Sequence, residues 1–448
     1  MNLKDIHIIY FIGIGGIGMS ALARYFHANG KQVAGYDKTS SPITENLQTL
    51  GIEIHFEDDI NLIPKEVFVK ENSLVVYTPA IPKTHTEFNY FKDNGFEVLK
   101  RAEILGRITN DTYCLAVAGT HGKTTTSSIL GHIMQPIEAT AFLGGIAENY
   151  SSNLILGKDK ISVVEADEFD RSFLHLSPNI ACITSMDADH LDIYGEHQAL
   201  LDSFKAFSNK VSDQLIVAKG LPIEGLTYAI EEDADYVASN LRIVNGVYVF
   251  DVKTPKNNIN DVEFSLPGRH NIMNALAALA LADVYGVSLD KIKEQLASFS
   301  GVQRRFAYKV KSESLVLIDD YAHHPTEINA VESAVREMYP SEEVLVVFQP
   351  HLFTRTRDFV DDFALSLSKF DEVMLLDIYP ARELPIEGVT SKWLLDKITA
   401  EKKQLLSKEQ MIKQVKFTNA KVIVMLGAGD IGLMVNEVKD ELIKEYNL

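Results

Sequence analysis

The stretch "VAGTHGKTTTSS", residues 117–128, contains Gly122-Lys123-Thr124, which is how a phosphate-binding loop ends. The usual loop, G-x-x-x-x-G-K-[ST], has its first glycine five positions before the second. Here Val117 stands at that position, and the nearest upstream glycine is Gly119. Such a loop needs N–H groups that face the phosphates, a lysine ammonium and a metal-binding hydroxyl. The segment 119–124 can supply all three, between a strand "CLAVA" and a helix expected from Ser127. The alternative is a chance Gly-Lys-Thr at a helix start.

Acidic side chains follow two further predicted strands. The strand in "ISVVEADEFD" ends in Glu165, Asp167 and Glu168, and the strand in "NIACITSMDADHLDIYG" ends in Asp187, Asp189 and His190. The carboxyl end of a strand in a parallel sheet is where a carboxylate holds Mg²⁺ beside bound phosphates. A histidine beside two acids at such a strand end fits the same cleft. These residues favour a Mg–ATP site over the chance Gly-Lys-Thr.

A second glycine-rich turn stands near the start of the chain, in "HIIYFIGIGGIGMSALARYF". Gly13, Gly15 and Gly18 form G-x-G-x-x-G between a predicted buried strand and an amphipathic helix expected from Met19. The next strand, "QVAGYD", ends at Asp37, where a dinucleotide fold places its ribose-binding acid. Backbone N–H groups at a helix N-terminus bind any nucleotide diphosphate, so the motif indicates a diphosphate and is weak evidence for NAD.

A third unit of the same kind lies near the C-terminus, in "KVIVMLGAGDIGLMV", with Gly427, Gly429 and Gly432. No strand that ends in an aspartate follows it. We therefore predict a last strand, a tight turn and a closing helix without a ligand.

The composition sets limits on the function. At about 150 residues per domain, 448 residues predict about three domains. The net charge of −19 disfavours nucleic acid as a partner. Two cysteines, Cys114 and Cys182, predict a reducing, cytoplasmic compartment rather than a disulfide framework. The apolar run 275–282 is far shorter than the roughly 20 residues that span a bilayer, so we expect no membrane insertion.

The chain resembles the Mur ligases, the ATP-dependent amide-bond enzymes of peptidoglycan precursor synthesis. The resemblance runs along nearly the whole chain, through "GIGGIGMSALA", "YTPAIP", "VAGTHGKTTT", "EADEFDRSFL", "DADHLDIYG", "PGRHNIMNALAA", "GVQRRF", "DDYAHHPTE", "FQPHLFTRTRD" and "GAGDIG". In that family the loop reads G-T/K-x-G-K-T/S, so the segment 119–124 is complete and lacks nothing.

The resemblance implies an α/β fold of three domains. It implies a Rossmann-like domain for the UDP sugar (1–106), a central P-loop ATPase domain with a mostly parallel sheet (107–304) and a C-terminal Rossmann-like domain for the amino acid (305–448). The implied substrates are UDP-N-acetylmuramate, L-alanine and ATP. ATP would convert the sugar's carboxylate into an acyl phosphate, which the amine then attacks. Magnesium, with two ions expected, is the implied cofactor, and the protein would be a monomer or a homodimer.

The resemblance also implies the site residues. Lys123, Glu165 and His190 would be catalytic, and the metal ligands would be Thr124, Glu165 and His190. The implied ATP-binding residues are Gly119, Thr120, His121, Gly122, Lys123, Thr124, Thr125, His270, Asn271, Arg304 and Asp320. The implied UDP-sugar-binding residues are Gly13, Gly15, Gly16, Gly18, Met19, Ser20, Asp37, Thr78, Ala80, His121 and Arg305. The implied amino-acid-binding residues are Tyr321, His323, His351 and Arg355. Arg304 and Arg305 lie on a linker, where surface charge is the alternative explanation.

Among the departures from the family, Leu352 bears on the amino-acid site, and three rival functions also stay open at this point. Many relatives read "FQPHR" where this chain reads "FQPHL", so Leu352 removes a guanidinium from the expected amino-acid site. A recycling ligase, which joins a murein peptide to the same UDP sugar, would share most of the first two domains. An NAD-dependent oxidoreductase built on residues 13–37 would not explain Lys123 or Glu165. A regulator without catalysis is disfavoured because the loop lysine, hydroxyl, acid and histidine are all present.

Overall fold

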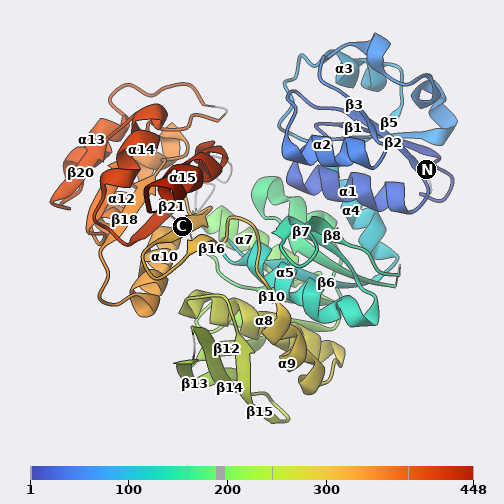
Figure 1. Cartoon of the computed structure of the whole chain (residues 1–448). Coiled ribbons are helices and arrows are strands. Elements are labelled where there is room, and N and C mark those ends of the chain that lie inside the picture. Colours follow the sequence, from blue (N-terminus) through green and yellow to red (C-terminus); the bar gives the residue numbers. More distant parts are fainter. Residues whose placement is uncertain (1–2, 159, 188–196, 245, 382, 447–448) are drawn as a thin grey trace. The chain divides into compact units, whose positions relative to one another are not determined.

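The computed structural model describes residues 3–158, 160–187, 197–244, 246–381 and 383–446. The chain forms two compact units. The first comprises Met1–Asn240, Phe250–Val262 and Met273–Phe299, and the second comprises Leu241–Val249, Glu263–Ile272 and Ser300–Leu448. Three β-sheets with flanking helices run along the chain (Figure 1). No helix among the described residues is both long and apolar enough to cross a bilayer.

The first sheet has five parallel strands in the order β3-β2-β1-β4-β5. Its strands are β1 (Ile8–Ile12), β2 (Gln32–Tyr36), β3 (Glu53–His55), β4 (Ser73–Tyr77) and β5 (Glu97–Lys100), and its helices are α1 (Ile17–Ala28), α2 (Pro42–Thr49), α3 (Thr86–Asp93) and α4 (Arg101–Asn110). β1 is buried along its whole length, as a strand with helices on both faces must be. The strand order reverses between β1 and β4, and ligands bind at such a switch point in open α/β sheets.

The second sheet has ten strands in the order β15-β14-β13-β12-β11-β10-β6-β9-β7-β8. The strands from β13 to β7 in this order pair in parallel, and β7 pairs with β8 in antiparallel. The strands are β6 (Tyr113–Ala118), β7 (Thr140–Ala147), β8 (Ser152–Ile155), β9 (Ile161–Ala166), β10 (Ile180–Ile183), β11 (Gln214–Ala218), β12 (Leu226–Ile230), β13 (Tyr236–Val244), β14 (Val247–Lys253) and β15 (Asn258–Phe264). The helices between and after these strands are α5 (Lys123–Met134), α7 (His197–Ser208), α8 (Arg269–Tyr285) and α9 (Leu289–Ser298).

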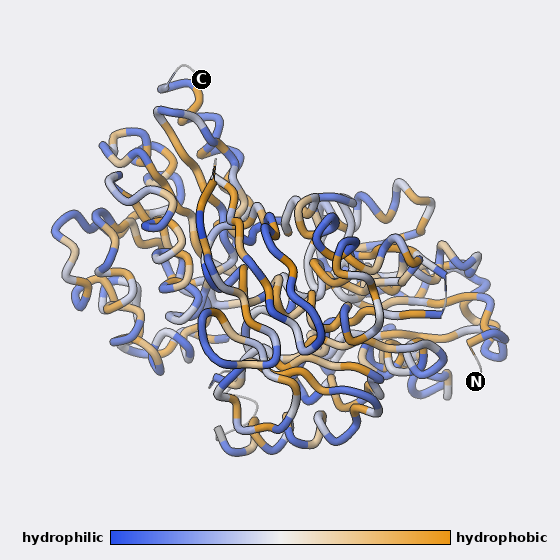
Figure 2. The backbone as a smooth tube through the Cα atoms, turned by 90° about the horizontal axis from the view of Figure 1, so that it is seen from below, coloured by the Kyte–Doolittle hydropathy of each residue, from blue (hydrophilic) through white to orange (hydrophobic). Residues whose placement is uncertain are grey.

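The third sheet has six strands in the order β16-β17-β21-β18-β19-β20, and only its edge strand β16 is antiparallel. Its strands are β16 (Ala307–Lys311), β17 (Val316–Asp320), β18 (Val344–Phe348), β19 (Glu372–Leu375), β20 (Lys402–Leu405) and β21 (Val422–Leu426). Its helices are α10 (Pro325–Met338), α11 (Phe353–Asp358), α12 (Val360–Leu367), α13 (Ser391–Lys397), α14 (Lys408–Gln414) and α15 (Ile431–Tyr446). Orange, hydrophobic segments recur along the backbone in Figure 2, and buried hydrophobic clusters lie on both faces of the third sheet.

The predicted α/β class and the three strand–glycine–helix units are confirmed. The third unit consists of β21, a turn at Gly427 and α15, as predicted. Two helix starts were predicted wrongly. α5 begins at Lys123 rather than at Ser127, because the left-handed Gly122 (φ 83°) ends the loop directly before it. α1 begins at Ile17 rather than at Met19, behind the extended Gly16.

A polar cluster lies buried in the first domain. The Tyr10 hydroxyl donates to Glu87 Oε2 at 2.6 Å and lies 2.7 Å from His55 Nε2. Burial raises the pKa of Glu87 to about 7, against an ordinary 4.5, although the Tyr10 hydrogen bond opposes the rise. Between pH 4.5 and 7 the unfolded chain therefore loses this proton while the folded chain keeps it, and the folded state loses stability as pH rises.

We predict that Glu87→Gln removes this slope. The free energy of unfolding of the variant, relative to wild type, should rise between pH 4.5 and 7 by up to about 1.4 kcal/mol per pH unit. Urea unfolding at several pH values measures the difference, and Glu66→Gln on the surface of the same domain is the control. A difference that is flat with pH would contradict the raised pKa.

Candidate functional site

The phosphate loop fills the turn between β6 and α5. Its two glycines adopt left-handed backbone conformations, with φ +135° at Gly119 and +83° at Gly122. A Cβ on Gly119 would lie 2.1 Å from Thr184 Oγ1, and one on Gly122 would lie 2.6 Å from Asn274 Oδ1. Both positions therefore require glycine, for backbone conformation and for space.

Side chains that follow β10 brace the loop. The Thr184 hydroxyl donates to the carbonyl oxygen of His121 at 2.5 Å, and the His121 N–H donates to Ser185 Oγ at 2.8 Å. Thr120 Oγ1 accepts from the Asp187 N–H at 3.0 Å. Thr125 is buried in the first turn of α5. The loop is therefore fixed by the neighbouring strand as well as by its own helix.

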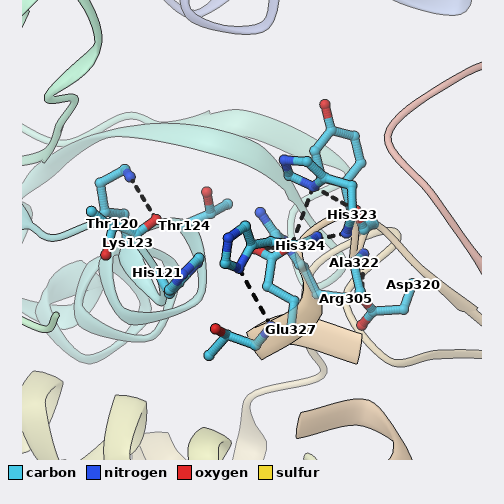
Figure 3. Close-up of polar contacts among 12 residues, drawn as sticks. Thr120, His121, Lys123, Thr124, Arg305, Asp320, Ala322, His323, His324 and Glu327 are labelled. Carbon is cyan, nitrogen blue, oxygen red and sulfur yellow. Dashed lines mark hydrogen bonds and ion pairs between the residues drawn. The ribbon is translucent and has the colours of Figure 1, made fainter. Parts of the chain in front are cut away.

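The Lys123 ammonium is turned into its own loop. It donates to the Gly119 carbonyl at 2.6 Å and the Thr120 carbonyl at 3.3 Å, and it lies 2.8 Å from Glu168 Oε2. Figure 3 shows Thr120, Lys123 and Thr124 together at the start of α5. Burial would lower the pKa of Lys123, but Glu168, Asp167 and Glu165 raise it above its ordinary value. The ammonium is therefore kept charged where a phosphate would need it.

Thr124 and Glu165 form the oxygen-rich part of the site. The Thr124 hydroxyl donates to Glu165 Oε1 at 3.1 Å, and Glu165 lies so close to Gly144 of β7 that a Cβ there would come within 2.1 Å of Oε2. A hydroxyl and a carboxylate are hard oxygen ligands of the kind that Mg²⁺ takes together with substrate phosphates. Among the described residues no group of three or more His, Cys, Asp or Glu could hold a metal, and this pair fits the smaller set that a nucleotide-bound Mg²⁺ needs. The predicted ligand His190 lies outside the described residues.

The glycine turn of the first sheet is held from two sides. The Gly15 N–H donates to Asp37 Oδ2 at 2.7 Å, so this predicted ribose ligand also fixes the turn. A Cβ on Gly13 would lie 2.4 Å from Thr78 Cγ2, which places the end of β4 against the turn, and the Ala80 N–H donates to Thr78 Oγ1 at 3.4 Å.

Three other residues of the predicted UDP-sugar set also lie at this turn. Met19 is buried in the core, and Gly16 packs beside its side chain. The Ser20 hydroxyl is buried and accepts from Asn153 Nδ2 at 2.8 Å. These contacts are structural, and the predicted roles of the residues in substrate binding stay predictions.

The second unit holds three residues that were predicted to bind ATP, and two of them, Asn271 and Asp320, are fixed by hydrogen bonds to the backbone. Asn271 donates to the Pro267 carbonyl at 2.7 Å, at the start of α8. Burial, with Arg305 second, lowers the pKa of the neighbouring His270 to about 4, so this imidazole is neutral near pH 7. Asp320 accepts from the N–H groups of Phe306 at 2.6 Å and of Ala322 at 2.7 Å, and burial raises its pKa to about 6.

Arg304 serves a structural purpose that the sequence did not reveal. Its guanidinium donates to the Gly427 carbonyl at 2.5 Å and to Asp319 at 3.4 Å, and it lies against Gly432 of the last turn. Its assignment to the ATP site stays a prediction.

The four residues that were predicted to bind the amino acid contact one another in succession. The ring of His323 packs edge-on to Tyr321 at 5.2 Å and to His351 at 5.9 Å, and Arg355 Nη1 lies 3.4 Å from His351 Nδ1. Arg305 lies over the Tyr321 ring at 5.2 Å. The structure thus brings together side chains from the turns after β17 and β18 and from α11.

Three family models match this chain in succession. They are described as the Mur ligase family catalytic domain (residues 8–113), the Mur ligase middle domain (117–282) and the Mur ligase glutamate ligase domain (304–431). The chain belongs to the Mur ligase family. Membership removes the NAD-dependent oxidoreductase as an alternative.

Several relatives are similar to this Mur ligase along its whole length. UDP-N-acetylmuramate–L-alanine ligases of Flavobacterium psychrophilum and Flavobacterium johnsoniae are 62% and 60% identical over 446 residues, 99% of each chain. The solved UDP-N-acetylmuramate–alanine ligase of Thermotoga maritima is 27% identical with a TM-score of 0.81, covering 98% of this chain and 99% of that one. A murein peptide ligase from Psychrobacter arcticus, 23% identical with a TM-score of 0.71, covers 98% of both chains and shares the fold.

Two residues of this Mur ligase that contact predicted site residues, one in each unit, were not predicted themselves. Glu168 was noted as an acid after β9, but its ion pair with Lys123 was not foreseen. Glu327 accepts from the N–H groups of His323 at 2.9 Å and His324 at 3.2 Å and lies 3.9 Å from Arg305 (Figure 3). The His324-x-x-Glu327 spacing, a reciprocal helix cap at the start of α10, was the available signal for Glu327.

We predict that Lys123→Ala reduces both turnover and stability. It leaves the fully buried Glu168 carboxylate without its ammonium, which should cost about 3–5 kcal/mol of folding free energy. The loss of a charged contact to a transferring phosphoryl group should slow turnover at least about 100-fold.

The double variant Lys123→Ala/Glu168→Gln separates the two effects. It should recover most of the thermal stability and none of the turnover, as measured by thermal unfolding and phosphate release. Lys158→Ala, which breaks an exposed ion pair with Glu138, is the control. Near-normal turnover in the folded double variant would remove Lys123 from the phosphate site.

Proposed function

We propose that this Mur ligase joins L-alanine to the carboxylate of UDP-N-acetylmuramate at the expense of ATP. The products would be ADP, phosphate and UDP-N-acetylmuramoyl-L-alanine, a precursor of peptidoglycan. The observation that carries the proposal is the 62% identity, over 99% of both chains, to a relative of that name. The phosphate loop, with the charged Lys123 and the Thr124–Glu165 pair, supports the use of ATP.

The chemistry explains why an ATP site is needed. A carboxylate does not condense with an amine in water near pH 7, so the carboxylate is first phosphorylated to an acyl phosphate. The amine of the amino acid then attacks the carbonyl carbon of the acyl phosphate, and the tetrahedral intermediate expels phosphate. Lys123 would neutralise charge on the transferring phosphoryl group. Thr124 and Glu165 would hold Mg²⁺, which supplies further positive charge at the phosphates when bound.

The first domain is proposed to bind the UDP part of the substrate. The N-terminus of α1 and the turn 13–18 offer backbone N–H groups to a diphosphate. Asp37 and Thr78 hold that turn in shape, at the switch point of the sheet where a ligand is expected.

The amino-acid site is proposed to be the cluster around Arg355. Arg355 is buried, and its planar guanidinium can hold an α-carboxylate through two parallel hydrogen bonds. Leu352, where many relatives have arginine, is buried in a left-handed backbone conformation (φ +73°) at the start of α11. Because position 352 has no guanidinium here, Arg355 is the one proposed amino-acid-binding residue that can hold the carboxylate with two parallel hydrogen bonds.

Phosphate release from ATP tests the proposed reaction. The purified protein, with Mg²⁺ and UDP-N-acetylmuramate, should release phosphate when L-alanine is added, and more slowly with glycine or L-serine. The same assay with a murein tripeptide in place of L-alanine tests whether the protein is a recycling ligase. Release with the tripeptide and none with L-alanine would overturn the proposal.

Arg355→Lys tests the acceptor site. Lysine keeps the charge and loses the two-pronged geometry, so the KM for L-alanine should rise at least about tenfold while the KM for ATP changes little. Steady-state kinetics with each substrate varied in turn is the measurement, and Arg357→Lys, half-exposed in the same helix, is the control. Unchanged alanine kinetics would move the acceptor site elsewhere in the third domain.

A further inference from the structure

Two neighbouring acids on one loop pair with cations at two different places. We define the acid loop as Asp167–Arg171, which follows β9. Asp167 Oδ2 lies 3.3 Å from Arg101 Nη2, and Glu168 Oε2 lies 2.8 Å from Lys123 Nζ. Lys123 belongs to the phosphate loop, whereas Arg101 begins α4 in the first domain. One short loop thus contacts both proposed nucleotide sites.

Arg101 lies directly against the glycine turn of the first sheet. A Cβ on Gly18 would come within 2.6 Å of Arg101 Nη1 and 2.9 Å of its Cδ, so the guanidinium packs on the backbone of Gly18. Gly18 lies in the first turn of α1, where the proposed diphosphate would meet the helix N-terminus. The Arg101 side chain is 26% exposed and can therefore reach an anion that arrives there.

The backbone of the acid loop is held in a conformation that it does not favour. Asp170 and Arg171 are consecutive non-glycine residues with φ of +53° and +55°. Left-handed conformations of such residues cost free energy and persist only where other contacts impose them. Here the contacts are backbone hydrogen bonds, from the Arg171 N–H to the Glu168 carbonyl at 2.9 Å and from the Phe173 N–H to the Asp167 carbonyl at 2.8 Å, together with the ion pairs of Asp167 and Asp170. Loss of one pair should loosen the loop and weaken the others.

We propose that the acid loop couples the two nucleotide sites by releasing Arg101 and Lys123 to the incoming phosphates. This proposal rests on the proposed function, since it takes the ligands to be ATP and a UDP sugar. An anion at the phosphate loop competes with Glu168 for Lys123, and an anion at the glycine turn competes with Asp167 for Arg101. Because both acids lie on one strained loop, breaking the first pair lowers the cost of breaking the second. Each ligand therefore binds more tightly when the other is present.

Titration calorimetry tests the coupling without turnover. The dissociation constant of UDP-N-acetylmuramate is measured with and without a saturating non-hydrolysable ATP analogue and Mg²⁺, in wild type and in Asp167→Asn. In wild type the analogue should tighten UDP-sugar binding at least about fivefold. In Asp167→Asn, Arg101 is already released, so the UDP sugar alone should bind nearly as tightly as it binds wild type with the analogue. The coupling factor, which is the dissociation constant of the UDP sugar without the analogue divided by that with it, should fall towards one.

A matched control and the reverse titration complete the experiment. Asp396→Asn makes the same chemical change in an exposed ion pair with Lys392 and should keep the wild-type coupling. Titrating the analogue with and without UDP sugar should give the same factor, because coupling is reciprocal. If both ligands bind and the factor is unchanged in Asp167→Asn, the coupling role of the loop is overturned. If wild type binds no UDP-N-acetylmuramate, the proposed function itself falls.

Discussion

The buried charge of Lys123 is the constraint on which the central site depends. An ammonium taken out of water is costly unless an opposite charge and hydrogen-bond acceptors replace the solvent. Glu168 supplies the charge at 2.8 Å, and the Gly119 carbonyl supplies an acceptor at 2.6 Å. Gly119 itself has no room for a side chain, because a Cβ there would lie 2.1 Å from Thr184 Oγ1. The acid after β9 and the carbonyl of the loop glycine therefore both serve to stabilise this one buried charge.

Much of the fold could be predicted from the sequence because parallel strands with helices on both faces are continuous apolar runs. β1, β6 and β21 were each found as such a run followed by glycine. The start of α5 was predicted wrongly because Thr124–Thr126 resembles a loop, and threonine has a low helix propensity. Tertiary contacts outweigh that propensity, since Thr126 donates to Asn274 at 3.2 Å across 148 residues. The phosphate loop and the cluster around Arg355 could be predicted only by resemblance and spacing.

The ion pairs of the site could not be predicted, because they depend on the order of the strands. Arg101 and Asp167 are separated by 66 residues and meet only because α4 leads from the first sheet into the second. Asp37 shows the same limit in another way. Its position after β2 was predicted, but its hydrogen bond to the Gly15 N–H depends on how the turn closes. A sequence motif thus identifies the residues of a turn, but it does not show which of their N–H groups are already bonded within the protein.

The two G-x-G-x-x-G turns of this chain show why the motif alone does not define a ligand. In both, the third glycine faces an arginine, which lies 2.6 Å from a Cβ on Gly18 in the first turn and 2.3 Å from one on Gly432 in the last. Arg304, at the last turn, is bound to the Gly427 carbonyl and to Asp319 of a buried strand, so its partners cannot move away. Arg101, at the first turn, is bound to Asp167, a partly exposed acid of the acid loop. The buried partners of Arg304 make it part of the closed turn, whereas the partly exposed partner of Arg101 is the one that a phosphate would replace in the proposed coupling.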